Sequence, residues 1–574
     1  MRKFFFGCAL LRAACAGWKI IALLLTASIL PALAHALDMP EIPALPGVPP
    51  SARQAAGTID PEKIRAHVRF LADDLLEGRG PGTRGGQLAA EYIATQFALA
   101  GARPAGENGT YFQAVPLMAV HTDAQKTTFT LLPAQGAPIE LKYGEDYVTK
   151  DQTGAPSVDL NAPIVFVGYG IDAPEYQWND YQGIDVKGKI LLAIVNEPPS
   201  NDEHFFQGRT LTYYGRWTYK FEEAARKGAV GVLVIHRDDL ASYGWEVVRN
   251  SGSTETSYLR NDPLSILKAA GWIQLDTAQK LFAAAGMNAD QMIEAAGKRG
   301  FRPIELPVRL KAHIVSQVRS YSSANVIGKV PGSESGPRGK VLFTAHYDHL
   351  GIDPSAVGDK IYNGAADNAT GCGILLEILR AYASASISPP RDVYFAAVTA
   401  EEQGLLGSEY LGMHPPEPIP DFALDLNFDE LLPIGVPLSV RVAGAERTSF
   451  YPVVQKTAAA FNLQIQPDDS PMAGHYYRSD HFSLARVGVP SFSIEEGDLF
   501  AGHTEEWGKQ QKADYDAHRY HRPSDEYSAE MDFRTDARLA QFGFLLAWQA
   551  LSLPDITWNP GDEFEAARKK SNGQ

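Results

Sequence analysis

The chain has 574 residues, of which 45% are hydrophobic and 21% are charged, a composition typical of a globular protein rather than a disordered chain, a collagen-like fibre or a polytopic membrane protein. Acidic side chains outnumber basic ones by 68 to 52, and the net charge of −16 repels phosphate backbones and anionic lipids, so nucleic acid is not an expected partner. Three cysteines are too few for a disulfide scaffold.

The first segment, residues 1–36, has the features of a secretory signal peptide. Four basic residues and no acid accompany an apolar run over residues 20–33, which leads into the small-residue pattern Ala34-His35-Ala36. We expect cleavage after Ala36, location in the periplasm or outside a Gram-negative-type cell, and no stable membrane association after cleavage. An uncleaved anchor is the alternative, because the apolar run approaches the length of a membrane span. The Pro- and Ala-rich residues 37–57 are predicted to be a linker.

The next part of the chain is predicted to be helical, with a glycine-rich loop at residues 76–83 between two helices in the range 60–100. This loop resembles a phosphate-binding loop only loosely, because no Gly-Lys-Ser/Thr follows it. Further on, apolar strands and a helix alternate in a unit of their own, followed by a predicted helical stretch at residues 262–296. The elements of this unit are strands 163–167, 189–195 and 230–235 and helix 220–227.

From residue 324 onward, apolar strands alternate with helices, which predicts an α/β fold with three layers and a mixed, largely parallel central sheet. The predicted strands are residues 341–345, 393–399, 424–428 and 490–494, and the main helices are residues 373–383 and 535–551. Open sheets of this kind bind ligands at the carboxyl ends of their strands.

Metal-type side chains follow most of these strands. They are His346 and Asp348 after the first strand, Asp367 before a helix, the adjacent Glu401 and Glu402, Asp429, and far downstream His521. Nitrogen and oxygen ligands without a thiolate are typical of two zinc ions in open hydrolytic sites, although cobalt or manganese could occupy the same set. Asp367 can bridge two cations, and one glutamate of the adjacent pair can bind metal while the other serves as general base. Cys372 begins an apolar helix and is expected to be a buried side chain rather than a nucleophile.

Five short motifs together resemble the signature of the co-catalytic di-zinc exopeptidases of metallopeptidase family twenty-eight. They are His346-Tyr347-Asp348, Asp367-Asn368, Glu401-Glu402, Asn427-Phe428-Asp429 and His521-Arg522-Pro523-Ser524-Asp525. The resemblance implies that His346, Asp367 and Asp429 hold the first zinc ion, that Asp367, Glu402 and His521 hold the second, and that Glu401 is the general base. It further implies that Asp348 orients the first histidine, that Tyr476 contacts the tetrahedral intermediate, and that the Asp367-Asn368 bond is often cis.

The resemblance also divides the chain into domains. Residues 58–135 and 317–555 are expected to form the catalytic domain, residues 136–316 an inserted protease-associated domain, and residues 556–574 a C-terminal tail. The implied function is a secreted zinc-dependent aminopeptidase that acts on peptide substrates. A carboxypeptidase or dipeptidase on the same metal site, a glutaminyl cyclase-like transferase and a non-catalytic binding protein like the transferrin receptor stay open as alternatives.

Overall fold

A computed structural model describes residues 39–241, 243–337 and 339–573, and residues 41–574 form one compact unit. The predicted signal peptide at residues 1–36 lies outside the described residues. Within the described part of the chain, no helix is both long and apolar enough to span a membrane.

The central sheet has the predicted mixed, largely parallel order. Four parallel strands are arranged in the order β21-β18-β14-β17, and β17 pairs antiparallel with β13. Their bounds are β14 (Lys340–His346), β17 (Val393–Val398), β18 (Phe422–Asn427), β21 (Ser491–Ser493) and β13 (Ile304–Val330). Every residue of β17 is buried, which explains why this strand is a continuous apolar run rather than an alternating pattern.

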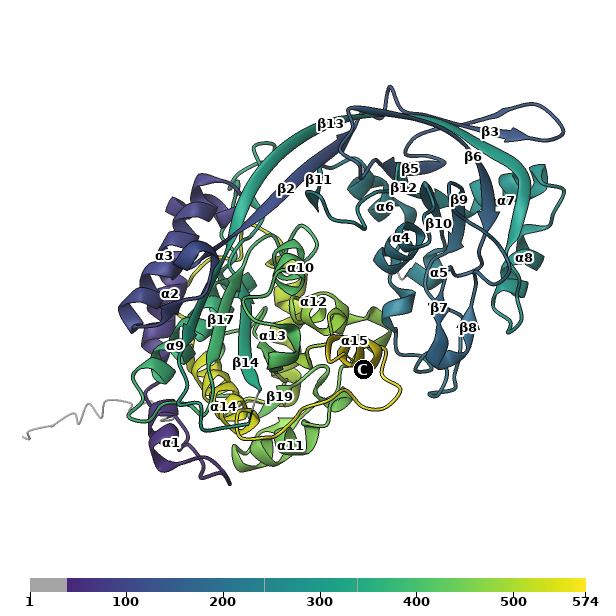
Figure 1. The fold of residues 1–574 in the computed structure, drawn as a ribbon. Coiled ribbons are helices and arrows are strands. Elements are labelled where there is room, and N and C mark those ends of the chain that lie inside the picture. The colour runs from purple at the N-terminus through teal and green to yellow at the C-terminus, as the bar shows by residue number, and fades with distance from the viewer. Residues whose placement is uncertain (1–38, 242, 338, 574) are drawn as a thin grey trace, which may run out of the picture. The chain divides into compact units, whose positions relative to one another are not determined.

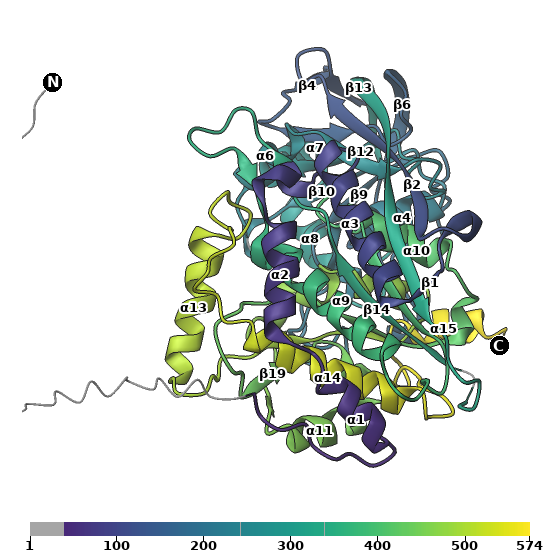
Figure 2. The ribbon, with the colours of Figure 1, turned by 90° about the vertical axis from the view of Figure 1, so that its left-hand side faces the viewer.

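Helices cover both faces of this sheet and complete three layers (Figure 1). Side chains alternate between the two faces of a strand. On one face, the rings of Phe343 and Phe395 stack with centroids 5.3 Å apart and lie against Tyr382 of helix α9. On the opposite face, Leu342 and Tyr394 pack in a separate cluster. The first layer contains α2 (Pro61–Leu71), α3 (Arg84–Ala100), α9 (Thr370–Ala383) and α14 (Arg534–Ala550), seen from outside in Figure 2. The second contains α10 (Leu406–Met413) and α12 (His481–Arg486).

Residues 136–316 contain a second set of parallel strands. These are β6 (Ser157–Phe166), β9 (Ile190–Ile194), β10 (Gly231–His236) and β12 (Ala269–Gln274), with β5 (Tyr147–Lys150) antiparallel at the edge. The prediction of helix over 262–296 is wrong for residues 269–274, because β12 is buried between β10 and β5. The helical part begins after it, in α7 (Leu275–Ala284) and α8 (Ala289–Ala296).

Strand β13 belongs to both sets of strands (Figure 1). Its first half, residues 304–315, pairs with β6, and residues 316–326 pair with β2 (Phe112–Thr122). The expected domain boundary at 316/317 therefore falls inside one continuous strand, because main-chain pairing on both sides keeps the strand extended.

Two segments that were expected to be a linker and a tail are packed into the fold. Residues 50–56 form helix α1 (Pro50–Ala56), which begins at a proline and buries three small alanines, Ala52, Ala55 and Ala56. Near the C-terminus, Trp558 and Phe564 are buried, and helix α15 (Glu565–Ser571) follows them. Large aromatic side chains in such a segment favour packing over a free tail because of the apolar area they bury.

Phe564 tests the packing of the C-terminal segment. Its side chain is 2% exposed and its ring lies within 6.4 Å of the rings of Tyr213, Tyr476 and Phe482. Phe564→Ala should lower the free energy of unfolding by about 3–5 kcal/mol in urea denaturation followed by tryptophan fluorescence. Leu99→Ala, at a side chain 76% exposed, is the control and should change it by less than about 0.5 kcal/mol; equal losses in the two variants would contradict the packing role.

Candidate metal centre

The predicted ligands meet at the carboxyl ends of the parallel strands. His346 is the last residue of β14, while Glu402 and Asp429 follow the ends of β17 and β18. Asp367 lies in the short turn η5 (Ala365–Ala369) before α9, and His521 lies after helix α13 (Glu505–His518). The sheet therefore brings together residues that are up to 175 positions apart in the chain, as expected for an open α/β fold.

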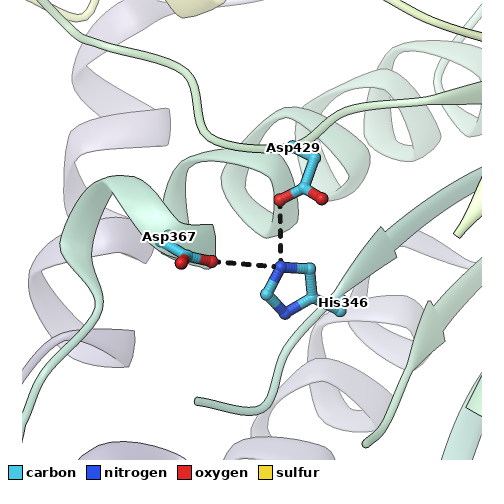
Figure 3. A group of neighbouring side chains, drawn as sticks. All are labelled: His346, Asp367 and Asp429. Carbon is cyan, nitrogen blue, oxygen red and sulfur yellow. Dashed lines mark hydrogen bonds and ion pairs between the residues drawn. The ribbon is translucent and has the colours of Figure 1, made fainter. Parts of the chain in front are cut away.

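The first group consists of His346, Asp367 and Asp429 (Figure 3). The Nε2 atom of His346 lies 2.9 Å from Asp429 Oδ1 and 3.2 Å from Asp367 Oδ1. Burial alone would lower the pKa of His346, but the charges of Asp429 and Glu401 and the hydrogen bonds with both aspartates hold this pKa well above its ordinary value. Two carboxylate oxygens and one imidazole nitrogen that converge in this way can hold a divalent cation.

The second group uses the other oxygen of Asp367. Asp367 Oδ2 lies 3.3 Å from His521 Nε2, which is 3.0 Å from Glu402 Oε2. Asp367 thus directs one oxygen to each group, which is the arrangement expected of a residue that bridges two cations.

A second imidazole, that of His349, faces the same pair of carboxylates. Its Nδ1 atom lies 2.5 Å from Glu402 Oε1 and 3.9 Å from Asp367 Oδ2, and the three residues also form a group that could hold an ion. Sequence reasoning did not select His349 as a ligand. The available signal was its place in the same loop as His346, three residues farther along the chain.

Glu401 is adjacent to both groups. Burial raises its pKa well above the ordinary value; His346 opposes this shift, whereas the charges of Glu402 and Asp429 add to it. The main-chain nitrogen of Glu401 donates a hydrogen bond to Asp348 Oδ1 at 3.2 Å. A carboxyl group with a raised pKa beside the metal-type ligands is suited to accept and return a proton.

Asp348 holds His346 in a different way from the one expected. The Nδ1 atom of His346 lies 3.2 Å from the main-chain oxygen of Asp348, whereas the carboxylate is 3.9 Å away, too far for a hydrogen bond. A backbone carbonyl can fix the ring orientation of a ligating histidine as a carboxylate does. Burial raises the pKa of the Asp348 carboxyl to about 7, and that carboxyl instead accepts the hydrogen bond from the Glu401 amide.

Asp525 and Asn368 fix the turn that carries Asp367. The buried carboxylate of Asp525 accepts hydrogen bonds from the amides of Ala366 and Asp367 at 3.1 Å, so the segment after His521 is tied to the bridging aspartate. The Asn368 side chain donates to the carbonyl of Phe428 at 2.9 Å, beside Asp429. The Asp367-Asn368 peptide bond is cis, in agreement with the resemblance.

The Tyr476 hydroxyl is hydrogen-bonded to the main chain rather than to a metal-type ligand. It donates to the carbonyl of Ser491 at 3.1 Å, so the predicted contact with a reaction intermediate would require this bond to break. The nearby Ser479, to which sequence reasoning gave no role, donates instead to Asp429 Oδ2 at 2.5 Å and accepts from Asn427. Ser479 therefore orients a ligand of the first group.

The second group is open to solvent on one side. The His521 side chain is 39% exposed, its ring stacks on Tyr520 at 3.9 Å, and both residues line a cavity of about 700 Å³ together with Val357 and Tyr362. Access for a substrate distinguishes a catalytic metal site from a closed structural one.

Comparison with known proteins finds similarity over part of the chain. Residues 325–542 match the family described as "Peptidase family M28". The chain is 32% identical over 111 residues to a vacuolar membrane protease of Lachancea thermotolerans, over 19% of this chain and 10% of that protein. It is 23% identical over 401 residues to a probable leucine aminopeptidase 2 of Aspergillus oryzae, over 67% of this chain and 66% of that protein. These matches thus span a tenth and just under two thirds of the two relatives. The solved aminopeptidase from an Aneurinibacillus species aligns with a TM-score of 0.45 at 17% identity, over 89% of this chain and 98% of that one.

Asp525→Ala tests the support of the bridging aspartate. The substitution leaves two buried amides, those of Ala366 and Asp367, without an acceptor. Since each buried donor without a partner costs about 1–3 kcal/mol, the free energy of unfolding of the metal-free protein should fall by about 2–6 kcal/mol. The exposed Asp185 accepts a hydrogen bond from the amide of Lys187, and Asp185→Ala should cost less than about 1 kcal/mol. Urea denaturation compares the two variants, and a loss at Asp525 no larger than that at Asp185 would rule out the supporting role.

Proposed function

We propose that this protein is a zinc-dependent aminopeptidase that hydrolyses the amino-terminal bond of peptides with a metal-activated water and Glu401 as general base. The match of residues 325–542 to "Peptidase family M28" supports this proposal. The observation that carries the proposal is the placement of Asp367, which faces His346 with one oxygen and His521 with the other. We further propose export to the periplasm or the medium, supported by the signal-like pattern of residues 1–36.

The chemistry of the donor set fits two zinc ions. Carboxylates of Asp367, Glu402 and Asp429 are buried against imidazoles, and buried carboxylates that lie this close together need positive charge beside them. His346, Asp367 and Asp429 would hold one ion, and Asp367, Glu402 and His521 the other. When bound, the ions would lower the pKa of a water molecule and polarise the carbonyl group of the substrate.

Residues of the protein itself would transfer the proton, orient the ligands and give the substrate access. Glu401 would take the proton of the attacking water and pass it to the leaving amine, a role supported by its place beside His346, Glu402 and Asp429 and by its raised pKa. Asp348 would keep His346 oriented through its carbonyl oxygen, and Ser479 would orient Asp429. The cavity lined by His521 would give a peptide access to this ligand of the second group.

The proposal is tested with aminoacyl arylamides and amino-terminally blocked peptides, before and after chelation and zinc restoration. Zinc-dependent cleavage of free-amino substrates alone is the expected result. Cleavage of blocked substrates would favour a carboxypeptidase or dipeptidase. Release of a cyclised product from amino-terminal glutamine peptides would favour a cyclase, and no reaction with zinc bound would favour a binding protein.

Glu401→Gln separates proton transfer from metal binding. It should lower kcat by about 10²–10⁴-fold because general base catalysis contributes a factor of that size, while the zinc content measured by atomic absorption stays that of the wild type. The adjacent Glu402→Gln is the matched comparison and should lower zinc content as well as activity. A Glu401→Gln protein with wild-type activity would contradict the mechanism.

Zinc stoichiometry tests the two ligand sets and decides between the two imidazoles at the second group. His346→Ala and His521→Ala should each reduce zinc content from two ions to one after dialysis, because each removes a ligand from a different set. His349→Ala should retain two ions if His349 binds no zinc and only forms a hydrogen bond with Glu402 Oε1. Loss of an ion in His349→Ala but not in His521→Ala would exchange the roles of these two residues.

A further inference from the structure

Arg79, in the glycine-rich loop of residues 76–83, is a buried guanidinium bonded to main-chain carbonyls. The side chain is 1% exposed. Its Nε atom donates to the carbonyl of Tyr347 at 2.7 Å, and its two terminal nitrogens donate to those of Leu71 at 2.6 Å, Gly364 at 2.9 Å and Asn363. One side chain therefore satisfies four carbonyl groups, which the planar fork of an arginine can do and a lysine ammonium with three donors cannot.

Three of these four carbonyls belong to the segments that carry metal-type ligands. Tyr347 directly follows His346, and Asn363 and Gly364 precede Asp367. The hydrogen bonds of Arg79 thus join the end of β14 to the start of the turn that holds the bridging aspartate. His346 Nε2 and Asp367 Oδ1 are 3.2 Å apart, so a small shift of either segment would change the geometry of the first group.

The backbone around Arg79 is shaped to turn this side chain inward. Glu77, Gly78 and Arg79 have φ values of 51°, 66° and 50°, a left-handed conformation that is unfavourable for the two residues with a Cβ atom. A Cβ atom on Gly78 would lie 2.4 Å from the carbonyl oxygen of Gly351 and 2.6 Å from that of Tyr362, so the loop lies directly against the strands β15 (Gly351–Ile352) and β16 (Ile361–Tyr362). Backbone in such an unfavourable conformation persists only where contacts with the surrounding structure hold it in place.

The charge of Arg79 also suits this place. Burial lowers the pKa of its guanidinium, while the negative charges of Asp367, Asp348 and Asp525 act in the opposite direction. An arginine stays protonated in proteins, so a fixed positive charge lies close to the carboxylates that would bind metal. It partly offsets their mutual repulsion without competing for their oxygens, because its own hydrogen bonds go to carbonyl groups.

We propose that Arg79 is a positioning residue that sets the distance between His346 and the bridging Asp367 and thereby the zinc affinity of the centre. The inference rests on the proposed function, because it assigns the residue that preorganises the same metal site. Arg79 acts through main-chain segments and touches neither ligand side chain in the hydrogen bonds described.

The test compares Arg79→Lys with Arg538→Lys in the full chain. Arg538 is equally buried, at 1% exposed, and also donates to a main-chain carbonyl, that of Phe461 at 3.0 Å, away from the ligand segments. Zinc affinity of the metal-free proteins is measured by competition with a chelating dye, and thermal melting reports folding. Arg79→Lys should bind zinc about 10–100-fold more weakly than the wild type, and saturating zinc should restore much of its lost activity, whereas Arg538→Lys should keep wild-type affinity.

Two results would overturn the proposal. The first is wild-type zinc affinity in Arg79→Lys. The second is an equal loss of zinc affinity in Arg79→Lys and Arg538→Lys, which would indicate a general effect on folding. Zinc binding is measured without peptide, so a wild-type protein that binds zinc but cleaves nothing would refute the peptidase and leave the role of Arg79 intact.

If Arg79→Lys fails to fold, a glycine pair gives an independent test. Gly78→Ala pushes the loop away from Gly351, whereas Gly101→Ala has a similar φ of 85° with nothing within 4 Å of the added Cβ atom. Only Gly78→Ala should weaken zinc binding. Equal zinc affinities in the two glycine variants would contradict the positioning role of Arg79.

Discussion

The burial of several carboxylates beside imidazoles at one edge of a sheet is the constraint on which the rest of this structure depends. Like charges that lie close together in a protein interior repel one another strongly and lose their hydration. Here Asp367, Asp429 and Glu402 share three histidines. Asp367 and Asp429 both face His346 Nε2, Asp367 and Glu402 both face His521 Nε2, and the other oxygen of Glu402 faces His349 Nδ1. Such an arrangement is useful only if the backbone segments that carry the ligands cannot move apart.

Long-range hydrogen bonds provide that restraint. Asp525 holds the amides of the Asp367 turn, Asn368 reaches the carbonyl beside Asp429, and Arg79 joins the turn to the segment after His346. None of these three side chains needs to contact a substrate. They correspond to the outer contacts that orient metal ligands and tune their affinity in proteins generally.

Residues 136–316 and the C-terminal segment share one hydrogen-bond network with the part of the chain that carries the metal-type ligands. Glu563 accepts hydrogen bonds from the amide of Tyr213, the guanidinium of Arg447 and the hydroxyl of Tyr477. Tyr477 lies two residues before Ser479, which contacts Asp429. The packing of the last residues is therefore connected to the first group of ligands, which gives the C-terminal segment a structural role that its sequence position alone does not suggest.

The sequence by itself determined the strands that form the central sheet and the polar residues that follow them. Fully buried parallel strands are continuous apolar runs, and the ligand types at their ends are visible as short motifs such as Glu401-Glu402. Tertiary structure decided what local patterns do not encode. It placed His349 beside Glu402, assigned the support of His346 to the carbonyl of Asp348 rather than to its carboxylate, and turned the Tyr476 hydroxyl to Ser491. It also decided the secondary structure and packing of the segments around residues 50, 270 and 560. A short apolar or alanine-rich stretch forms a helix, a strand or a packed segment according to the partners that cover it.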